Sequence, residues 1–240
     1  MKKLIRRYFP WAVKPISIFL SFFRVHYRKS YSQFGEDMVL SSLIWDKKIK
    51  KGFYVDIGCF EPKKYSNTYF YYKKGWCGIN VDARPGSMRA FNKYRKRDIN
   101  IETGISDECK ELNYYCFNEL PYNTFSYEMA LAVINNGIGL IKKEVVQTIK
   151  LEQLFERYLP LNQHIDFLSI DVEGFDLKVL KSNNWDKYKP TFILVEMHDI
   201  DLNSIAKSDI YQFLNNLGYE LASVAYITFI FELKNIRVYE

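Results

Sequence analysis

Carboxylates follow or interrupt apolar runs at three places in the sequence, and each place could support chemistry. Asp56 stands within FYVDIGC, Asp82 ends CGINVD, and the pair Asp171 and Glu173 follows FLSI. A carboxylate at the end of a strand can hold a ribose, accept a proton from a hydroxyl or bind a divalent cation. Because Asp171 and Glu173 are two residues apart, an extended chain directs both side chains to one face.

A histidine and a serine extend this set of candidates. His198 follows FILVEM, and an imidazole suits a general base because it ordinarily titrates close to neutral pH. A structural or loop-lining role would explain His198 equally well. Ser106 follows INIETGI, and we expect it to lie, with Thr103, near the base of a bound nucleoside. Gln33 and Glu36 could also face the site, although helix capping accounts for them as well.

Purely structural roles would also explain the acidic residues. Asp56 could cap the following helix while Gly58 makes an ordinary turn. Asp82 could be the N-cap of a helix that begins after Pro85. The pair at 171 and 173 could be a helix cap and a surface acid. The order of the predicted elements has to decide between these explanations and a functional site.

An alternation of strands and helices is predicted to position the candidates. From Asp56 to Asp82 the chain has the pattern of a strand, a crossover helix and a strand, the βαβ unit of a nucleotide-binding sheet. Further strands are predicted at 99–105, 167–170 and 192–198, a basic amphipathic helix at 88–97, and an antiparallel closing pair at 221–225 and 228–233. In such a sheet ligands bind at the carboxyl ends of the strands, where the candidates lie.

The alternation lapses between about residues 107 and 160. Strands are predicted at 112–117 and 144–151, with a polar and aromatic loop containing NTFS (123–126) between them and a short helix at 152–158 after them. Long excursions beside a site commonly select the substrate or act as a lid. We therefore expect an inserted substrate or lid segment here.

The positive charge is concentrated in an N-terminal arm, residues 1–30. The whole chain carries a net charge of +6, but the arm holds eight basic residues and no acid, which leaves 26 of the 34 basic residues against 28 acidic ones. A slightly acidic domain from 31 to 240 argues against nucleic acid as a partner. Four scattered cysteines are typical of reduced cytoplasmic thiols.

The arm also contains an apolar run at 16–23, flanked by cations. A transmembrane helix needs roughly 20 apolar residues, so this run is too short to span a bilayer, and no small-residue cleavage site follows it. An interfacial helix attracted to anionic lipid would suit the pattern, which predicts a cytoplasmic protein with peripheral contact at the inner face of the membrane. A helix packed on the domain or on a partner subunit is the alternative.

Taken in order, the motifs resemble those of the FkbM-type methyltransferases, which are S-adenosylmethionine-dependent enzymes. The resemblance covers residues 32–233 and rests on YSQFGED, FYVDIGCFEPKKYSNT, GWCGINVDARP, RDINIETGIS, NTFS and DFLSIDVEGFDLKVL. It implies an α/β fold with a Rossmann-like class I methyltransferase sheet: seven mostly parallel strands with an antiparallel terminal strand, interrupted by the inserted segment.

The resemblance also implies roles for individual residues. Asp56 and Gly58 would lie against the methionine part of the cofactor, Asp82 would hold its ribose, and the DVEG segment (171–174) would face the reacting centre. The cofactor contacts so predicted are Asp56, Gly58, Glu61, Asn67, Asp82, Ser106 and Asp171. The predicted catalytic residues are Asp171, Glu173 and His198. Gly58 is followed by CFEP where many methyltransferases have further glycines, and a cofactor without pyrophosphate can accept a single glycine.

The usual reaction of such enzymes is O-methylation, so we expect a sugar hydroxyl in a surface polysaccharide, a glycoconjugate or a secondary metabolite as acceptor. Metal dependence stays open; a divalent Mg²⁺ or Mn²⁺ would be held by Asp171 and Glu173. A nicotinamide-dependent Rossmann oxidoreductase is one alternative, although GxGxxG is absent. A non-catalytic membrane-recruited scaffold is another, although it gives no reason for acids at three strand ends.

Overall fold

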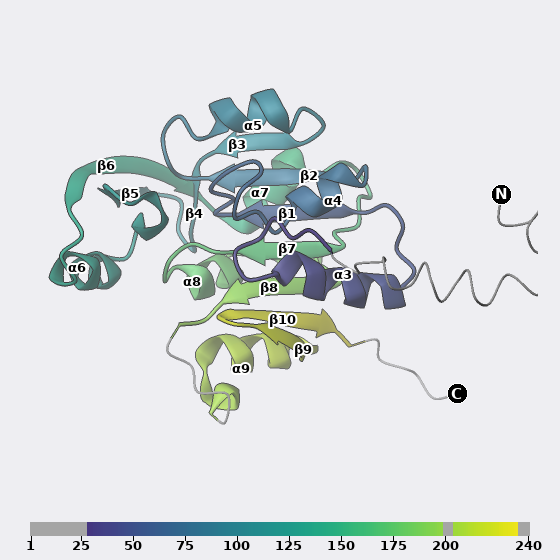
Figure 1. Cartoon of the computed structure of the whole chain (residues 1–240). Helices are drawn as coiled ribbons and strands as arrows, with labels where there is room; N and C mark the ends of the chain where they lie inside the picture. Colours follow the sequence, from purple (N-terminus) through teal and green to yellow (C-terminus); the bar gives the residue numbers. More distant parts are fainter. Residues whose placement is uncertain (1–27, 199–203, 235–240) are drawn as a thin grey trace, which may run out of the picture.

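The structure, a computed structural model, describes residues 28–198 and 204–234. The predicted N-terminal arm therefore lies almost wholly outside the described residues. Figure 1 shows a central sheet with helices on both faces and a smaller lobe projecting from one end. None of the helices in the described ranges is long and apolar enough to cross a membrane.

The central sheet has seven strands in the order β3-β2-β1-β7-β8-β10-β9. The strands are β1 (Phe53–Ile57), β2 (Cys77–Asp82), β3 (Ile99–Glu102), β7 (Phe167–Ile170), β8 (Phe192–Glu196), β9 (Tyr219–Ala225) and β10 (Thr228–Leu233). Strands β3, β2, β1, β7 and β8 pair in parallel, whereas β10 runs antiparallel to both of its neighbours, β8 and β9. The predicted fold class, with its antiparallel closing strand, is confirmed.

Apolar residues alternate along β1 between two cores. Phe53, Val55 and Ile57 belong to the larger core, which is completed by helices α7 (Leu151–Tyr158), α8 (Asp176–Lys181) and α9 (Asp209–Asn216). Tyr54 faces the other core, which α3 (Glu36–Asp46) and α4 (Tyr69–Lys73) cover. All five residues of β1 are buried, as expected for a central strand with helices on both faces.

The predicted strand at 99–105 is wrong in part, because the chain leaves the central sheet at Thr103. Residues 104 and 105 form β4 (Gly104–Ile105), which pairs in parallel with β6 (Leu140–Ile149) of the smaller sheet. The third strand of that sheet is β5 (Glu111–Phe117), antiparallel to β6. The chain thus turns from the central sheet directly into the inserted segment.

The inserted segment is more ordered than the predicted loop. Between β5 and β6 it forms a 3-10 turn, η2 (Leu120–Tyr122), and the helix α6 (Tyr127–Asn135). The Ser126 side chain caps α6 by accepting a hydrogen bond from the Met129 N–H (3.2 Å), and Ala130 and Val133 pack on Phe117. The loop prediction was wrong here because it rested on NTFS (123–126), which only leads into the helix, whereas the apolar run at 129–134 that follows it forms α6.

Candidate functional site

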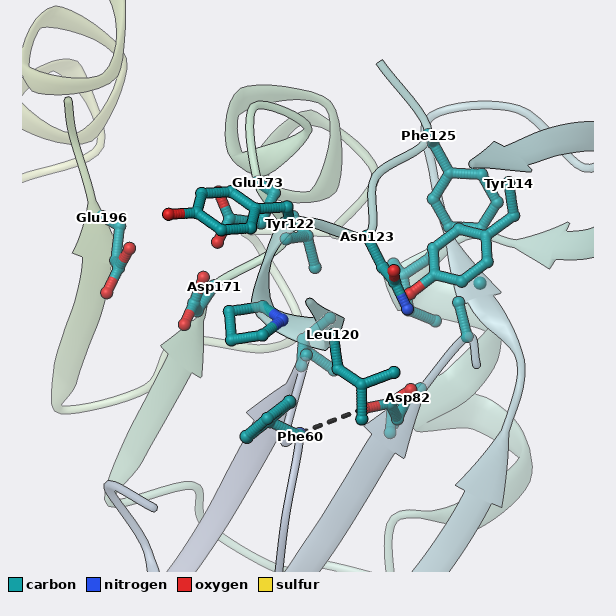
Figure 2. A pocket seen from close by; sticks show the side chains of 18 of the residues that line it. Phe60, Asp82, Tyr114, Leu120, Tyr122, Asn123, Phe125, Asp171, Glu173 and Glu196 are labelled. Atoms are coloured by element: carbon teal, nitrogen blue, oxygen red, sulfur yellow. Dashed lines mark hydrogen bonds between the residues drawn. The ribbon is translucent and has the colours of Figure 1, made fainter. Parts of the chain in front are cut away.

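A cavity of about 270 Å³ opens at the carboxyl ends of the parallel strands. Figure 2 shows carboxylates from three strand ends pointing toward the same space, with the η2 turn across it. The strand ends contribute Ile57, Gly58, Val81, Asp82, Ala83, Asp171, Val172, Glu173, Glu196 and His198, and the inserted segment contributes Tyr114, residues 120–123 and Phe125. The segment that follows β4 in sequence thus completes a site built on the central sheet.

Gly58 lets two strand ends approach each other closely. Its φ is +85°, in the left-handed region that favours glycine, and its N–H donates to the Val81 carbonyl (2.9 Å). A Cβ built on Gly58 would lie only 1.7 Å from the Asp171 carbonyl oxygen. A residue with a side chain cannot occupy this position without moving the backbone of one strand.

Asp82 is held in one orientation at the end of β2. Its carboxylate accepts hydrogen bonds from the backbone N–H of Phe60 (3.0 Å) and of Arg84 (2.8 Å). The residue is 7% exposed, and burial raises the pKa of this carboxyl, an effect that the two backbone donors and the Arg84 charge oppose. A carboxylate fixed in this way has lone pairs left for a pair of ligand hydroxyls.

Three carboxylates gather on the other side of the cavity, at the ends of β7 and β8. Burial, followed by repulsion from neighbouring acids, raises the pKa of Glu196 to about 8, that of Glu173 to about 7 and that of Asp171 well above its usual range. The His198 Nε2 lies 3.6 Å from Glu196 Oε2 and 3.9 Å from Glu173 Oε2. Groups of this kind can take up a proton near neutral pH.

The largely buried side chain of Glu196, 11% exposed, predicts a pH-dependent stability. Its pKa is raised above the unfolded value, so its contribution to stability is present at low pH and is lost as the pH rises from about 4.5 toward 8. We expect Glu196→Gln to raise the free energy of unfolding at pH 8 by on the order of 3 kcal/mol, with little change at pH 4.5. Urea unfolding at the two pH values measures this difference.

Glu156 provides the control for that experiment, because its side chain is 49% exposed and forms a solvent-exposed pair with Lys187, at 3.6 Å. Glu156→Gln should change stability by less than about 0.5 kcal/mol at either pH. Equal stability of Glu196→Gln and the wild-type protein at pH 8 would show that the cluster carries no electrostatic cost.

Thr124 connects the inserted segment to the acidic strand end. Its hydroxyl donates to the Glu173 carbonyl (2.7 Å) and accepts from the Ser126 N–H (2.9 Å). Glu173 and Gly174 have φ values of +49° and +87°, a conformation that is costly for a glutamate and needs support from its surroundings. Thr124, only 1% exposed, gives that support and so helps to direct the Glu173 carboxylate into the cavity.

We expect Thr124→Val to lower the free energy of unfolding by about 1–3 kcal/mol, because it leaves a buried carbonyl and a buried N–H unpaired. Amide exchange at Gly174 and Phe175 should also become faster. Thr124→Ser keeps the hydroxyl and is the control, expected to retain slow exchange at both amides. If valine and serine have the same effect on exchange, the hydroxyl does not hold this loop.

Of the nine residues predicted as catalytic or as cofactor contacts, five line the cavity and four lie outside it; Gln33 and Thr103, also expected near the site, line it as well, and Glu36 does not. Gly58, Asp82, Asp171, Glu173 and His198 line it, whereas Asp56, Glu61, Asn67 and Ser106 do not. The predicted catalytic residues thus share one cavity, while the predicted cofactor contacts divide between the cavity and its surroundings.

The four residues outside have other neighbours. Asp56 faces the core of Tyr54 and accepts a hydrogen bond from Thr68 Oγ1 (2.9 Å); burial raises its pKa to about 6. Asn67 Nδ2 donates to Ser169 Oγ (3.1 Å), and Ser106 Oγ donates to Asp107 Oδ1 (3.0 Å). Glu61 lines a separate depression. Their predicted contact with a cofactor stays a prediction.

Several lining residues were not predicted, above all Glu196 and the aromatic residues Phe60, Tyr65 and Tyr122. Glu196 left a signal in the sequence, as the one charged residue of FILVEM. The aromatic residues left none, because they come from turns whose distance from the site only the folded chain defines. Among the described residues, no group of three or more His, Cys, Asp or Glu is arranged to hold a metal ion.

Comparison with known proteins gives one match. The family model described as the methyltransferase FkbM domain matches residues 56–221. No curated protein matches the chain. The matched residues run from Asp56 in β1 to Leu221 in β9 and include all of the strand ends that line the cavity.

Proposed function

This chain belongs to the FkbM methyltransferase family, and from that premise we propose that it transfers the methyl group of S-adenosylmethionine to a sugar hydroxyl. The acceptor would belong to a surface polysaccharide, a glycoconjugate or a secondary metabolite. The observation that carries this proposal is that the Gly58 turn, the oriented Asp82 carboxylate and the acidic cluster of Asp171, Glu173 and Glu196 line a single cavity.

The charge of the cavity favours this cofactor over a dinucleotide. Asp82, Asp171, Glu173 and Glu196 line it, and among the described residues no Lys or Arg does. A sulfonium cation is stabilised by such surroundings, whereas the pyrophosphate of a nicotinamide dinucleotide would be repelled. The nicotinamide-dependent alternative is therefore disfavoured. When bound, S-adenosylmethionine supplies a methyl group on a positively charged sulfur.

Each part of the cavity has a role in this proposal. Asp82 holds the two ribose hydroxyls, and Gly58 leaves room for the ligand beside the ends of β1 and β7. Glu173, with a pKa raised to about 7, takes the proton of the acceptor hydroxyl, assisted by His198. The role of the protein is otherwise to align the hydroxyl oxygen for in-line attack, which is where most of the rate enhancement would arise.

Aromatic residues at the cavity support a sugar as the acceptor. Tyr65 and Tyr122 are 45% and 39% exposed although both line the cavity. Their rings can pack against the apolar face of a sugar, while the nearby carboxylates accept hydrogen bonds from its hydroxyls. The acidic lining would disfavour an acceptor with a negative charge near the reacting hydroxyl.

Calorimetry with S-adenosylmethionine and S-adenosylhomocysteine tests the cofactor. We expect saturable binding that Asp82→Asn weakens at least about ten-fold, because the ribose hydroxyls lose their charged acceptor. Asp186→Asn, at an exposed position outside the cavity, should bind as the wild-type protein does. A folded sample that binds neither ligand would refute the proposal. Transfer of labelled methyl to a panel of oligosaccharides and sugar nucleotides would then identify the acceptor.

In the proposed function the basic and apolar residues 1–30 bring a cytoplasmic enzyme to the anionic inner face of a membrane. The support is the sequence pattern of eight cations around a short apolar run. The full chain should sediment with anionic liposomes, whereas a version that begins at Tyr31 should stay in the supernatant. Equal sedimentation of the two proteins would show that the arm does not contribute to membrane binding.

A further inference from the structure

A second depression lies beside the first and differs from it in charge. It is formed by the loop after β1 (residues 60–63), the loop after β2, and Ala90 and Tyr94 of α5 (Met88–Tyr94). Phe60 lines both depressions and has a φ of +52°. Its N–H is bound to Asp82 and its carbonyl to Arg84. Phe60 is therefore a fixed wall between two separate sites.

Basic side chains converge on this second depression. Lys63 and Arg84 line it. Lys63 Nζ lies 3.8 Å from the centre of the ring of Tyr94, another lining residue, and Lys93 Nζ, which is not among the lining residues, lies 5.3 Å from the same ring. A Cβ on the lining residue Gly86 would be 4.0 Å from Arg89 Nε, which places a fourth cation at the edge.

Within the part of the chain that the structure describes, none of these four cations lies within 4.0 Å of a carboxylate oxygen, although the Arg84 charge acts on Asp82. The ion pairs found there involve none of Lys63, Arg84, Arg89 and Lys93. One carboxylate, Glu61, lines the depression. The charged residues described in its lining are thus Lys63, Arg84 and Glu61, a net positive balance that contrasts with the acidic cavity on the other side of Phe60 and favours an anionic ligand.

A buried hydroxyl in the same wall also lacks a partner. Ser87 lines the depression and is 7% exposed, and no hydrogen bond to its Oγ is found among the described residues. Unpaired buried hydroxyls are uncommon in folded proteins. Rotation about its single side-chain torsion can direct the Ser87 hydroxyl toward a ligand, which would then supply the missing acceptor.

Arg84 adds a directional donor. Its Nη2 donates to the Phe60 carbonyl (2.9 Å), which holds the guanidinium in place and leaves its other N–H groups for a ligand. A planar guanidinium with several free donors matches the oxygens of a phosphate, and a nearby ammonium adds charge. A carboxylate would offer two oxygens and one charge, fewer than this set of donors can use.

We infer that this second depression binds a phosphoryl group, as a phosphate ester or a diphosphate, held by Arg84, Lys63 and the Ser87 hydroxyl. The site is separate from the cofactor cavity, so the inference does not depend on the proposed methyl transfer. Arg84 links the two, because its backbone N–H orients Asp82 while its side chain faces the second depression.

Calorimetric titration of the full chain, at constant ionic strength and without cofactor, tests the inference with inorganic phosphate, pyrophosphate and glucose 1-phosphate as probes. We expect saturable binding of at least one probe. Lys63→Glu should weaken it by at least about ten-fold, since an attractive charge becomes a repulsive one. Tightest binding of glucose 1-phosphate would assign the site to a sugar phosphate, and tightest binding of pyrophosphate would assign it to a free diphosphate.

Ser87→Ala separates a binding role from a structural one. Because no hydrogen-bond partner of this hydroxyl is found among the described residues, the thermal midpoint should not fall, while the affinity for the probe should drop several-fold. Lys110→Ala is the control, since Lys110 is an exposed lysine that pairs with Glu108, and it should bind as the wild-type protein does. Absence of saturable binding, or equal affinity of the Lys63→Glu, Ser87→Ala and wild-type proteins, would overturn the inference.

Discussion

Gly58→Ala is expected to lower the free energy of unfolding by on the order of 3–4 kcal/mol and to abolish binding in the main cavity. Two costs add at this position. A left-handed φ is strained for alanine, and the new methyl would lie 1.7 Å from the Asp171 carbonyl oxygen, so the end of β1 or of β7 must move. Both ends line the cavity, and urea unfolding with calorimetry measures the two effects.

Gly75→Ala is the matched control for this prediction. Gly75 also has a left-handed φ, of +92°, but a Cβ there would meet nothing within 4 Å. It isolates the conformational strain, for which we expect about 1–2 kcal/mol and unchanged ligand binding. If the two variants lose the same stability and Gly58→Ala still binds, the close approach of β1 and β7 is not what requires a glycine.

The parts of the site that could be predicted are those set by strand ends. Asp82, Asp171 and Glu173 each follow a run of buried residues, and the parallel sheet brings the ends of such runs to one edge (Figure 1). The spacing of Asp171 and Glu173 also predicted a shared face. Both residues do line the cavity, although Glu173 lies in a left-handed turn beyond the strand.

The sequence did not predict on which face of the sheet a polar side chain within a strand lies. Asp56 alternates with Val55 and Ile57, so it lies on the same face of β1 as Tyr54, toward a polar network rather than toward the cavity. The environment of Asp56 depends on Arg95. The predicted basic amphipathic helix at 88–97 would place Arg95 on the surface. Instead α5 ends at Tyr94 and Arg95 turns inward; only tertiary packing determines that.

The inserted segment shows the same limit. Its strands were predicted from alternation, but its place against the acidic loop depends on the contact of Thr124 with Glu173, which are 49 residues apart in sequence. Nothing local in NTFS indicates that partner. Tyr122 of η2 and Tyr114 line the cavity (Figure 2), and they could not be assigned to it from the sequence for the same reason.

Arg95→Met is expected to have the largest effect on stability, a loss of about 3–5 kcal/mol. The side chains of Arg95 and Asp98 are both 0% exposed, and Arg95 Nε donates to Asp98 Oδ2 at 2.8 Å. Asp98 also accepts hydrogen bonds from the Tyr54 hydroxyl and the Asn80 amide. Methionine fills a similar volume but leaves the Asp98 carboxylate buried without its cation, which is the costly way to break such a pair.

Two further variants separate charge from volume in this prediction. Arg97→Met, two residues away, removes an exposed guanidinium that stacks on the Tyr72 ring at 3.8 Å and should cost less than about 1 kcal/mol. Adding Asp98→Asn to Arg95→Met should recover part of the lost stability, because the unpaired charge is then absent. No recovery in the double variant would mean that packing, not charge, dominates at Arg95.

Arg95→Met should also weaken ligand binding in the main cavity. Arg95 Nη1 donates to the Pro62 carbonyl (3.0 Å) and Nη2 to Thr68 Oγ1 (2.9 Å), and Thr68 in turn donates to Asp56. Arg95 thereby holds both the end of the loop that begins at Gly58 and the Asp56 carboxylate beneath it. We expect Arg95→Met, where still folded, to bind S-adenosylhomocysteine at least about ten-fold more weakly. Unchanged affinity would confine Arg95 to a purely structural role.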